Sequence, residues 1–449
     1  MHVPDGYLSP LTCGVGYVAA TPFWLVASAR VKKAVGGRTV PLLAVFSAFT
    51  FTIMMFNVPV PGGTTAHAVG ATLVAIVLGP WAAVLSTSVA LIIQALFFGD
   101  GGVTAIGVNC FNMAVALPLT GYLTYRLIAG RSDMLSQRRV VAAAAGSYIG
   151  ISVAALLVGV ELGLQPHIAS TNGIPNYSPY GFGAAVPSML VAYVFGASFV
   201  EACVTALGLA YLQKSFPEIL ARGQPKIVRM RASKRVVSPW IAVAGLTGIA
   251  VTALFLAGLL AGHGRLDRWA GLDWAIASWN GVAQTVIVSA AVSALALPTL
   301  YLLLRKATST PRAIVMVLAA LLIWAPVGLI APGDAFGEEA SASQAEVTAA
   351  LAARAQGDAG LFDALPAVNR QCACVPSGMA DGGPAGHALF ASYRPPWISD
   401  SDAAWRQAVG YQIAGLAGIG LLALLGFSAM KFGRWLLPGP PPDWRNAEE

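Results

Sequence analysis

The sequence predicts an all-α polytopic membrane protein, with a bundle of seven helices followed by about four further transmembrane helices. Hydrophobic residues make up 57% of its 449 residues and charged residues only 10%, and the mean hydropathy is +0.69. Apolar stretches of roughly 17–25 residues, long enough to cross a bilayer, recur along the chain. Soluble domains of this length do not combine these features.

The apolar stretches give eleven predicted spans, in two groups separated by a basic segment. The stretch 67–98 is ambiguous because it could form one long tilted helix, or two helices broken at Gly79-Pro80. The first group comprises 8–29, 39–60, 67–79, 81–98, 103–125, 140–163 and 184–213, and the second comprises 239–262, 284–304, 312–331 and 409–430.

The positions of Lys and Arg predict the orientation, since these residues concentrate in cytoplasmic loops. With the amino terminus outside and the spans alternating, the inner loops and the cytoplasmic C-terminal tail hold most of the 27 basic residues. A single span over 67–98 would instead place the basic cluster of 214–238 outside, so the charge pattern favours the break. The net charge of +7 then reflects topology and anionic lipid of the cell membrane, not nucleic-acid binding.

These spans imply three parts of the chain. Residues 1–215 form the seven-helix domain, 216–238 form a basic cytoplasmic linker, and 239–449 form a membrane extension of about four spans. Within the extension, residues 332–408 form a long outer segment. Its first part, 340–355, is predicted to be helical, and the Gly-, Pro- and Asp-rich remainder is predicted to be loop.

The most informative chemical feature is the pair Met1-His2, together with His67. The Met1 amine, the deprotonated His2 backbone nitrogen and the nearer His2 ring nitrogen can close adjacent chelate rings around one ion. A second imidazole completes four nitrogen donors in a plane, which suits Ni(II), Cu(II) or Co(II) better than tetrahedral zinc. The plainer alternative is that His2 belongs to a flexible chain end.

The predicted topology favours the chelate, because it brings Met1-His2 and His67 to the same outer face. Pro4 and Asp5-Gly6 are turn formers that can fold the first residues over the helix ends. The segment 1–7 has no basic n-region typical of a signal peptide. We expect Met1 to be retained, since its removal generally requires a small second residue.

Other polar residues near the outer ends of the spans are candidates to support this site. Asn57, Thr65 and Asn109 can hydrogen-bond the ring N–H groups that face away from a metal, although such residues also serve ordinary helix packing. Glu201 is the one acid placed well within a span. Intramembrane acids are functional candidates, and Glu201 either bonds across the bundle, shapes the lid of the substrate domain, or has a packing role.

The motifs of the first 215 residues together resemble the CbiM/NikM family, the substrate-specific membrane components of energy-coupling-factor transporters for cobalt and nickel. The resemblance rests on Met-His-x-x-Asp-Gly-Tyr-Leu at 1–8, the stretch Asn57 to Gly70, Phe98-Gly99-Asp100-Gly101-Gly102 followed by Asn109 and Asn112, Gln165-Pro166, Pro179-Tyr180-Gly181, and Glu201-Ala202.

This resemblance implies seven helices with the amino terminus outside. It implies that the metal is bound by the terminal amine of Met1, the backbone nitrogen and imidazole of His2, and the imidazole of His67. It also implies partners: ATPase subunits and a transmembrane coupling subunit. In the extension, two spans joined by an outer loop resemble the small auxiliary subunit of such transporters, without a confirming motif.

The outer segment offers Cys372, Cys374 and His387 as a second possible metal site. Three candidate ligands without regular spacing are weak evidence for a metal, and outside the membrane the cysteines have disulfide formation as an equal alternative.

These observations predict a non-enzymatic membrane component of an ATP-driven importer, with Co(II) or Ni(II) as the transported substrate. Energy must come from partners, because the sequence lacks a Walker A loop; Gly208 to Ser215 mimics its spacing but lacks the second glycine. One alternative is a self-sufficient secondary metal-ion transporter, which needs an ion relay across the membrane. Another is a membrane enzyme or sensor that acts through residues 332–408. Nothing in the sequence separates cobalt from nickel.

Overall fold

The computed structural model describes most of the first domain and parts of the extension. The described residues are 1–34, 39–60, 64–217, 220, 309–330, 342–379, 388–399 and 401–436. The predicted spans 239–262 and 284–304, most of the predicted linker 216–238, and His387 lie outside the described residues.

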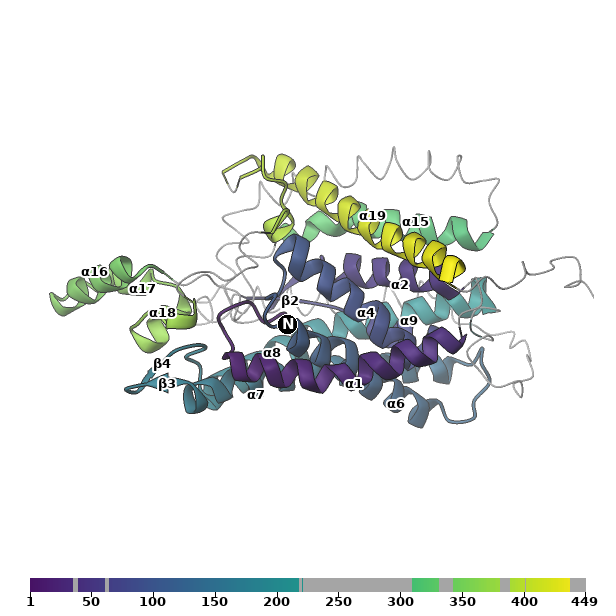
Figure 1. The fold of residues 1–449 in the computed structure, drawn as a ribbon, viewed down its shortest axis with the longest axis horizontal. Helices are drawn as coiled ribbons and strands as arrows, with labels where there is room; N and C mark the ends of the chain where they lie inside the picture. Colours follow the sequence, from purple (N-terminus) through teal and green to yellow (C-terminus); the bar gives the residue numbers. More distant parts are fainter. Residues whose placement is uncertain are drawn as a thin grey trace, which may run out of the picture.

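The first domain is a bundle of long apolar helices that run side by side (Figure 1). Across the described part of the chain, six helices are long and apolar enough to cross a membrane, which confirms the predicted helical membrane fold. The helices are α1 (Pro10–Ala34), α2 (Thr39–Met54), α3 (Ala71–Leu78), α4 (Pro80–Ile93) with η1 (Gln94–Phe98), α5 (Ile106–Asn109) with η2 (Cys110–Ala116) and α6 (Leu117–Ala129), α7 (Gln137–Ile168), and α8 (Phe182–Ala192) with η3 (Tyr193–Ala197) and α9 (Ser198–Ser215).

Small residues bring these helices close together. A Cβ atom on Gly146 of α7 would lie 2.5 Å from the carbonyl oxygen of Gly121 on α6, and one on Gly150 would lie 2.6 Å from that of Leu117. Close backbone approach at glycines is the usual way in which membrane helices pack. The antiparallel pair α6–α7 therefore forms a tight wall of the bundle.

The ambiguous stretch 67–98 contains two helices, which break at Gly79. Gly79 has φ +93°, a value that glycine adopts readily, and Pro80 opens α4. His67 precedes α3 and Asp100 follows η1, yet both contact His2. The two helices therefore run in opposite directions. With eight residues, α3 is about 12 Å long and forms only part of the predicted span 67–79.

The predicted span 39–60 extends too far at its C-terminal end, and this boundary is wrong. Helix α2 ends at Met54, and the chain then forms a hairpin. Strand β1 (Asn57–Val60) pairs antiparallel with β2 (Thr64–His67), with Asn57 opposite His67. The apolar residues Val58 and Val60 extend the hydropathy signal of α2, but the alternating prolines of this segment cannot continue a helix. A second short hairpin joins β3 (Ser170–Thr171) and β4 (Ile174–Pro175).

Two helices of the extension pack against α2 (Figure 1). They are α15 (Ser309–Trp324), which continues in η4 (Ala325–Ile330), and α19 (Ala404–Leu436), in the regions predicted to span at 312–331 and 409–430. Gln412 donates a hydrogen bond to the Ile323 carbonyl at 3.0 Å, and Tyr411 donates one to the Met55 carbonyl at 2.7 Å. The extension is thus joined directly to the first domain.

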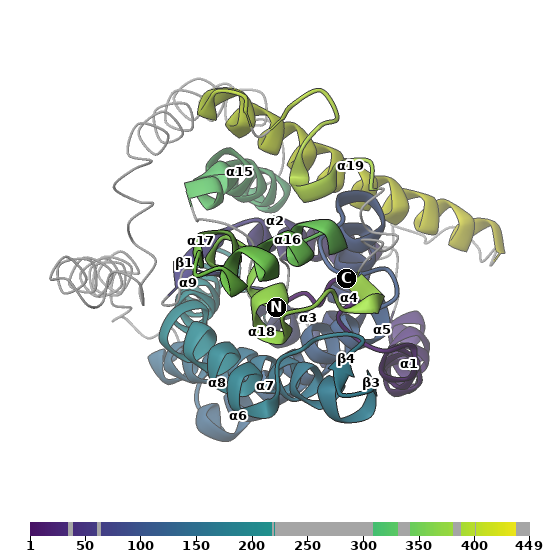
Figure 2. The ribbon, with the colours of Figure 1, turned by 90° about the vertical axis from the view of Figure 1, so that its left-hand side faces the viewer.

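The outer segment lies over the end of the bundle near the amino terminus (Figure 2). The predicted helix 340–355 is observed as α16 (Gln344–Ala355), which begins with a capping box of Ser343 and Glu346. The prediction of loop for the remainder is only partly right, because its described residues contain four short helical elements. These are α17 (Gly360–Asp363), α18 (Ala367–Cys372), η5 (Ser377–Met379) and η7 (Ala391–Tyr393).

Candidate metal site

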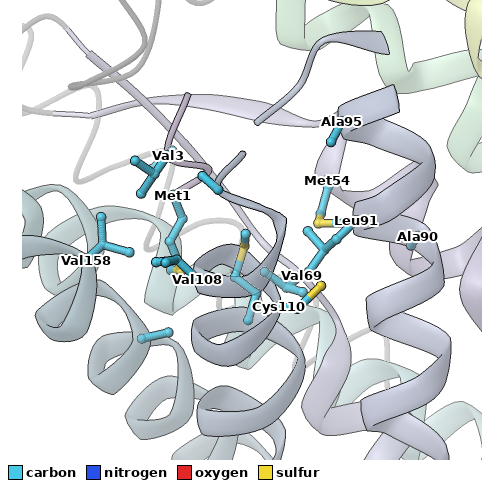
Figure 3. Packing of buried hydrophobic residues seen from close by; sticks show 14 of the residues in the cluster. Met1, Val3, Met54, Val69, Ala90, Leu91, Ala95, Val108, Cys110 and Val158 are labelled. Atoms are coloured by element: carbon cyan, nitrogen blue, oxygen red, sulfur yellow. The ribbon is translucent and has the colours of Figure 1, made fainter. Parts of the chain in front are cut away.

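The amino terminus is inserted into the bundle and is not a flexible end. Met1 and His2 are each 3% exposed and Val3 is 1% exposed. Figure 3 shows Met1 and Val3 packed near Val108 of α5 and Val158 of α7. The first three residues therefore belong to the core of the bundle.

The backbone of Val3 is held by hydrogen bonds from the segment after η1. The Val3 N–H donates to Asn109 Oδ1 at 2.8 Å, and the Val3 carbonyl accepts from Asn109 Nδ2 at 3.0 Å. The same carbonyl accepts from the Gly102 N–H at 2.8 Å. Asn109 was predicted to hydrogen-bond a ligand ring, but its side chain instead fixes the main chain next to His2.

The predicted turn at Pro4 to Gly6 is present and is also fixed. The Asp5 carboxylate accepts hydrogen bonds from the Val103 N–H at 3.1 Å and from the Thr104 N–H at 2.8 Å. Gly6 has φ +83°, and a Cβ atom there would lie 2.3 Å from the Gly378 carbonyl oxygen. Only glycine fits this position without displacing the outer segment.

The two predicted imidazoles meet at the buried terminus. The rings of His2 and His67 have centroids 4.8 Å apart and an interplanar angle of 40°, and their residues are 3% and 4% exposed. Within the described part of the chain, Nε2 of each ring has no hydrogen-bond partner. His67 Nδ1 lies 3.2 Å from the Ala68 carbonyl oxygen. The structure therefore brings Met1, His2 and His67 together, as the topology predicted.

The environment keeps His67 neutral. Burial lowers the pKa of His67 well below its ordinary value of 6.5, and the positive charges of the Met1 amine and of His2 lower this pKa further. A neutral imidazole is the form that binds metal ions. His67 is thus in the ligand form at neutral pH.

Asp100 is the main residue of the site whose role the sequence did not predict. Its Oδ1 forms a hydrogen bond with His2 Nδ1, the ring nitrogen that the chelate requires, and its side chain is only 16% exposed. Burial by itself raises the pKa of the carboxyl, but the charge and the hydrogen bond of His2 outweigh burial and lower this pKa to about 2. A fixed carboxylate therefore lies beside the nitrogen cluster. Its position in Phe98-Gly99-Asp100-Gly101-Gly102, directly after a span, was the available signal.

Glu201 holds the connection that carries His67. Its Oε2 accepts hydrogen bonds from the Val69 N–H at 2.7 Å and the Gly70 N–H at 2.8 Å, at the start of α3. Gly70 has φ +74°, and a Cβ atom there would lie 2.5 Å from the Phe49 ring. Of the roles weighed for Glu201, the structure shows the hydrogen bond across the bundle.

The other candidates for support of the site are placed less fully. Asn57 is half-buried and lies opposite His67 in the β1–β2 register. Thr65 lies in β2, and its side chain is outside the described residues. For both residues, a hydrogen bond to a ligand ring remains a prediction.

The two cysteines of the outer segment are paired with each other. Cys372 and Cys374 form a disulfide across two positions of sequence, as in the disulfide alternative. In the described ranges, no group of three or more His, Cys, Asp or Glu side chains is arranged to hold a metal ion. The cluster at the amino terminus differs from such a group because two of its nitrogens belong to the main chain.

Comparisons with known proteins match this region. The family model described as "Cobalt uptake substrate-specific transmembrane region" matches residues 2–219. The fused nickel transport protein NikMN of Rhodobacter capsulatus is 47% identical over 262 residues, covering 58% of this chain and 74% of that protein. A probable fused nickel transport protein, LarMN of Lactiplantibacillus plantarum, is 44% identical over 60% of this chain and 78% of its own length.

A shorter relative and a solved structure match the first domain. A putative metal transport protein of Methanocaldococcus jannaschii is 44% identical, and the match covers 52% of this chain and all of that protein. The crystal structure of a transition metal transporter is 53% identical over 48% of this chain and 93% of its own, with a TM-score of 0.45.

Proposed function

Because the chain belongs to the CbiM family of cobalt uptake transmembrane proteins, we propose that it is the substrate-binding membrane component of an energy-coupling-factor importer. Its substrate is Co(II) or Ni(II), and ATP hydrolysis in partner subunits drives uptake. Members of this family are metal transporters rather than enzymes, and we propose no catalytic role for the chain.

The observation that carries this proposal is that the amino terminus and the imidazoles of His2 and His67 lie together in the buried interior of the bundle. The Met1 amine, the His2 backbone nitrogen, His2 Nδ1 and the His67 imidazole supply four nitrogen donors, the set that Ni(II) and Co(II) accept in a plane. When the ion binds His2 Nδ1, it replaces the hydrogen bond of this nitrogen to Asp100. The negative Asp100 carboxylate then lies beside a divalent cation, and this favours binding.

The proposed orientation places this site at the outer face of the cell membrane. The charge distribution supports it, since most basic residues then lie in cytoplasmic loops and in the cytoplasmic C-terminal tail. The outer segment, which contacts Gly6 through Gly378 and Asp100 through Tyr393, lies outside in the same arrangement. Capture of the ion at the outer face is followed by reorientation of the domain.

The proposed partners are the ATPase subunits and the transmembrane coupling subunit of the importer. They are required because the sequence has no Walker A loop to bind ATP. The family description, which names a substrate-specific region of cobalt uptake, supports a division of labour between subunits.

Uptake of radioactive nickel and cobalt by cells tests this function. Cells that express the chain together with the ATPase and coupling subunits should accumulate the metal. Cells in which the ATPase subunits carry an inactivating substitution should not. Uptake by the chain without partners, abolished by an ionophore that collapses ion gradients, would support a secondary transporter instead.

A further inference from the structure

The outer segment contributes a side chain to the surroundings of the proposed metal site. Tyr393 of η7 donates a hydrogen bond from its hydroxyl to Asp100 Oδ2. Gln94 Nε2 donates to the same Tyr393 oxygen at 2.6 Å and to Asp100 Oδ2 at 3.2 Å. Since Asp100 Oδ1 is bonded to His2 Nδ1, hydrogen bonds run from the extension to a proposed ligand.

Aromatic packing fixes Tyr393 in this position. Its ring stacks on Phe98 with centroids 5.2 Å apart, and Phe390 also stacks on Phe98, at 5.6 Å. Tyr411 of α19 approaches the Tyr393 ring at 5.4 Å. Stacked rings at these distances attract each other beyond the burial of their surface. Tyr393 is 5% exposed and Phe98 is fully buried.

A backbone hydrogen bond joins the same segment to the end of the helix that precedes Asp100. The Phe390 N–H donates to the Phe97 carbonyl at 2.8 Å. This carbonyl belongs to the last turn of η1, where helix carbonyls lack partners within the helix. The segment around Tyr393 therefore completes the structural element that positions Asp100.

The backbone around Tyr393 adopts an unfavourable conformation. Ser392 has φ +52° and Tyr393 has φ +57°, so two successive residues other than glycine are left-handed. Such a conformation is a clear outlier for a bulky residue. Such a conformation persists only where surrounding contacts determine it, and it is often found at functional sites. Here the contacts that hold this backbone conformation include the hydrogen bond of Tyr393 to Asp100.

We propose that Tyr393 is a positioning residue of the metal site, which acts through Asp100 on His2. The inference rests on the proposed metal-binding function. Tyr393 and Gln94 both bond Oδ2 of Asp100, which leaves Oδ1 directed at His2. The carboxylate is thereby held beside His2, where its hydrogen bond orients the imidazole before the ion binds and where its negative charge favours the cation once the ion has replaced that bond. Residues that position metal ligands without binding the metal usually contribute 10–100-fold to affinity, and we expect an effect of this size for Tyr393.

The test is Ni(II) affinity, measured by titration calorimetry on the purified full chain with its native amino terminus. Tyr393→Phe removes only the hydroxyl and should weaken Ni(II) binding about 10–100-fold. Gln94→Met, which removes the other donor to Oδ2, should weaken it in the same direction. Asp100→Asn should weaken binding at least as much. Adding Tyr393→Phe to Asp100→Asn should then have no further effect, because Tyr393 acts through Asp100.

Tyr148→Phe is the matched control, since it removes a tyrosine hydroxyl that donates to the Val194 carbonyl at 2.8 Å and not to Asp100. Its Ni(II) affinity should equal that of the unaltered chain. Unchanged or tighter binding in Tyr393→Phe would overturn the proposal, and tighter binding would mean that Asp100 competes with the ion for His2. Losses that add up in the double variant would overturn it as well. His2→Ala distinguishes failure of this inference from failure of the proposed function. If His2→Ala binds Ni(II) normally, the proposed metal site itself is wrong.

Discussion

The two imidazoles of His2 and His67 are the side chains on which metal binding depends in the proposed site. His2→Ala and His67→Ala should each abolish high-affinity binding of both Ni(II) and Co(II), because each removes one of four donors. Neither residue lies in the middle of a span, so the bundle should remain folded. Metal analysis of the purified variants after dialysis measures this.

His167→Ala is the control for these substitutions. His167 is an exposed residue whose ring stacks on Phe182, away from the amino terminus. The His167→Ala variant should bind metal like the unaltered chain. If the His2 and His67 variants keep their metal, or if both lose only one of the two metals, the planar four-nitrogen site is incorrect.

Proton release on binding gives a second prediction at the residue scale. An amino-terminal amine has an ordinary pKa of about 7.7–8.0, and the His2 amide ionises only with the help of the metal. His67 contributes few protons, because burial lowers its pKa well below 6.5 and it is already neutral at pH 7. Protons compete with the metal for the amine, so affinity should fall progressively as the pH drops below about 7.7.

Calorimetry in buffers of different ionisation enthalpy counts the protons released. More than one proton per ion is expected at pH 6, from the amine and the amide. A count near zero would indicate carboxylate or carbonyl ligands, and attention would then move to Asp5 and Asp100.

The start of α3 is the element that places His67. Glu201→Gln keeps the shape of the side chain but replaces the carboxyl group that accepts from the Val69 and Gly70 N–H groups with an amide. An amide has only one acceptor atom, and its nitrogen only donates, so the connection should loosen. Metal affinity should fall about 10-fold, the lower end of the range for residues that support ligands, while the chain stays folded.

Glu161→Gln serves as the matched variant for Glu201→Gln. Glu161 is another acid of the bundle, and its Oε2 accepts from Asn112 Nδ2 at 2.7 Å, not from the β2–α3 connection. Its metal affinity should stay within about twofold. Equal losses in the two variants would show that Glu201 acts only through general packing of the bundle.

Hydropathy and charge predicted those helices whose sequence signal lies within the helix itself or in its flanking loops. Long apolar stretches identified the spans, and the basic residues favoured the break at Gly79-Pro80, which the structure contains. The β1–β2 hairpin was missed because Val58 and Val60 continue the hydropathy of α2. Hydropathy measures burial, and a buried strand and a buried helix have the same value.

For the whole molecule, contacts between distant parts of the chain determine what the sequence could not predict. Met1, His2 and His67 were identifiable because chelation is a property of the residues themselves. Asp100 and Gln94 join the site only after α3 and α4 fold back on each other. Tyr393 joins it from 293 residues away, through a segment predicted to be loop. Such contacts depend on tertiary packing, for which one sequence carries no periodic signal.

The burial of the amino terminus makes its length critical. Met1 is 3% exposed, and the hydrogen bonds of Val3 to Asn109 and Gly102 fix the distance from Met1 to the site. One residue added before Met1 converts the terminal amine into an amide, which removes the donor of the five-membered chelate ring, and the added residue must also enter the packed core.

The most direct measurement therefore compares Ni(II) content and affinity of the full chain with its native terminus and with a single glycine placed before Met1. The native chain should bind one ion with high affinity, and the extended chain should lose this binding while it remains folded and elutes as one species. A chain in which a residue is added after Glu449 is the control and should bind like the native chain. If the amino-terminally extended chain binds Ni(II) as tightly as the native chain, the amine is not a ligand and the proposed chelate is wrong.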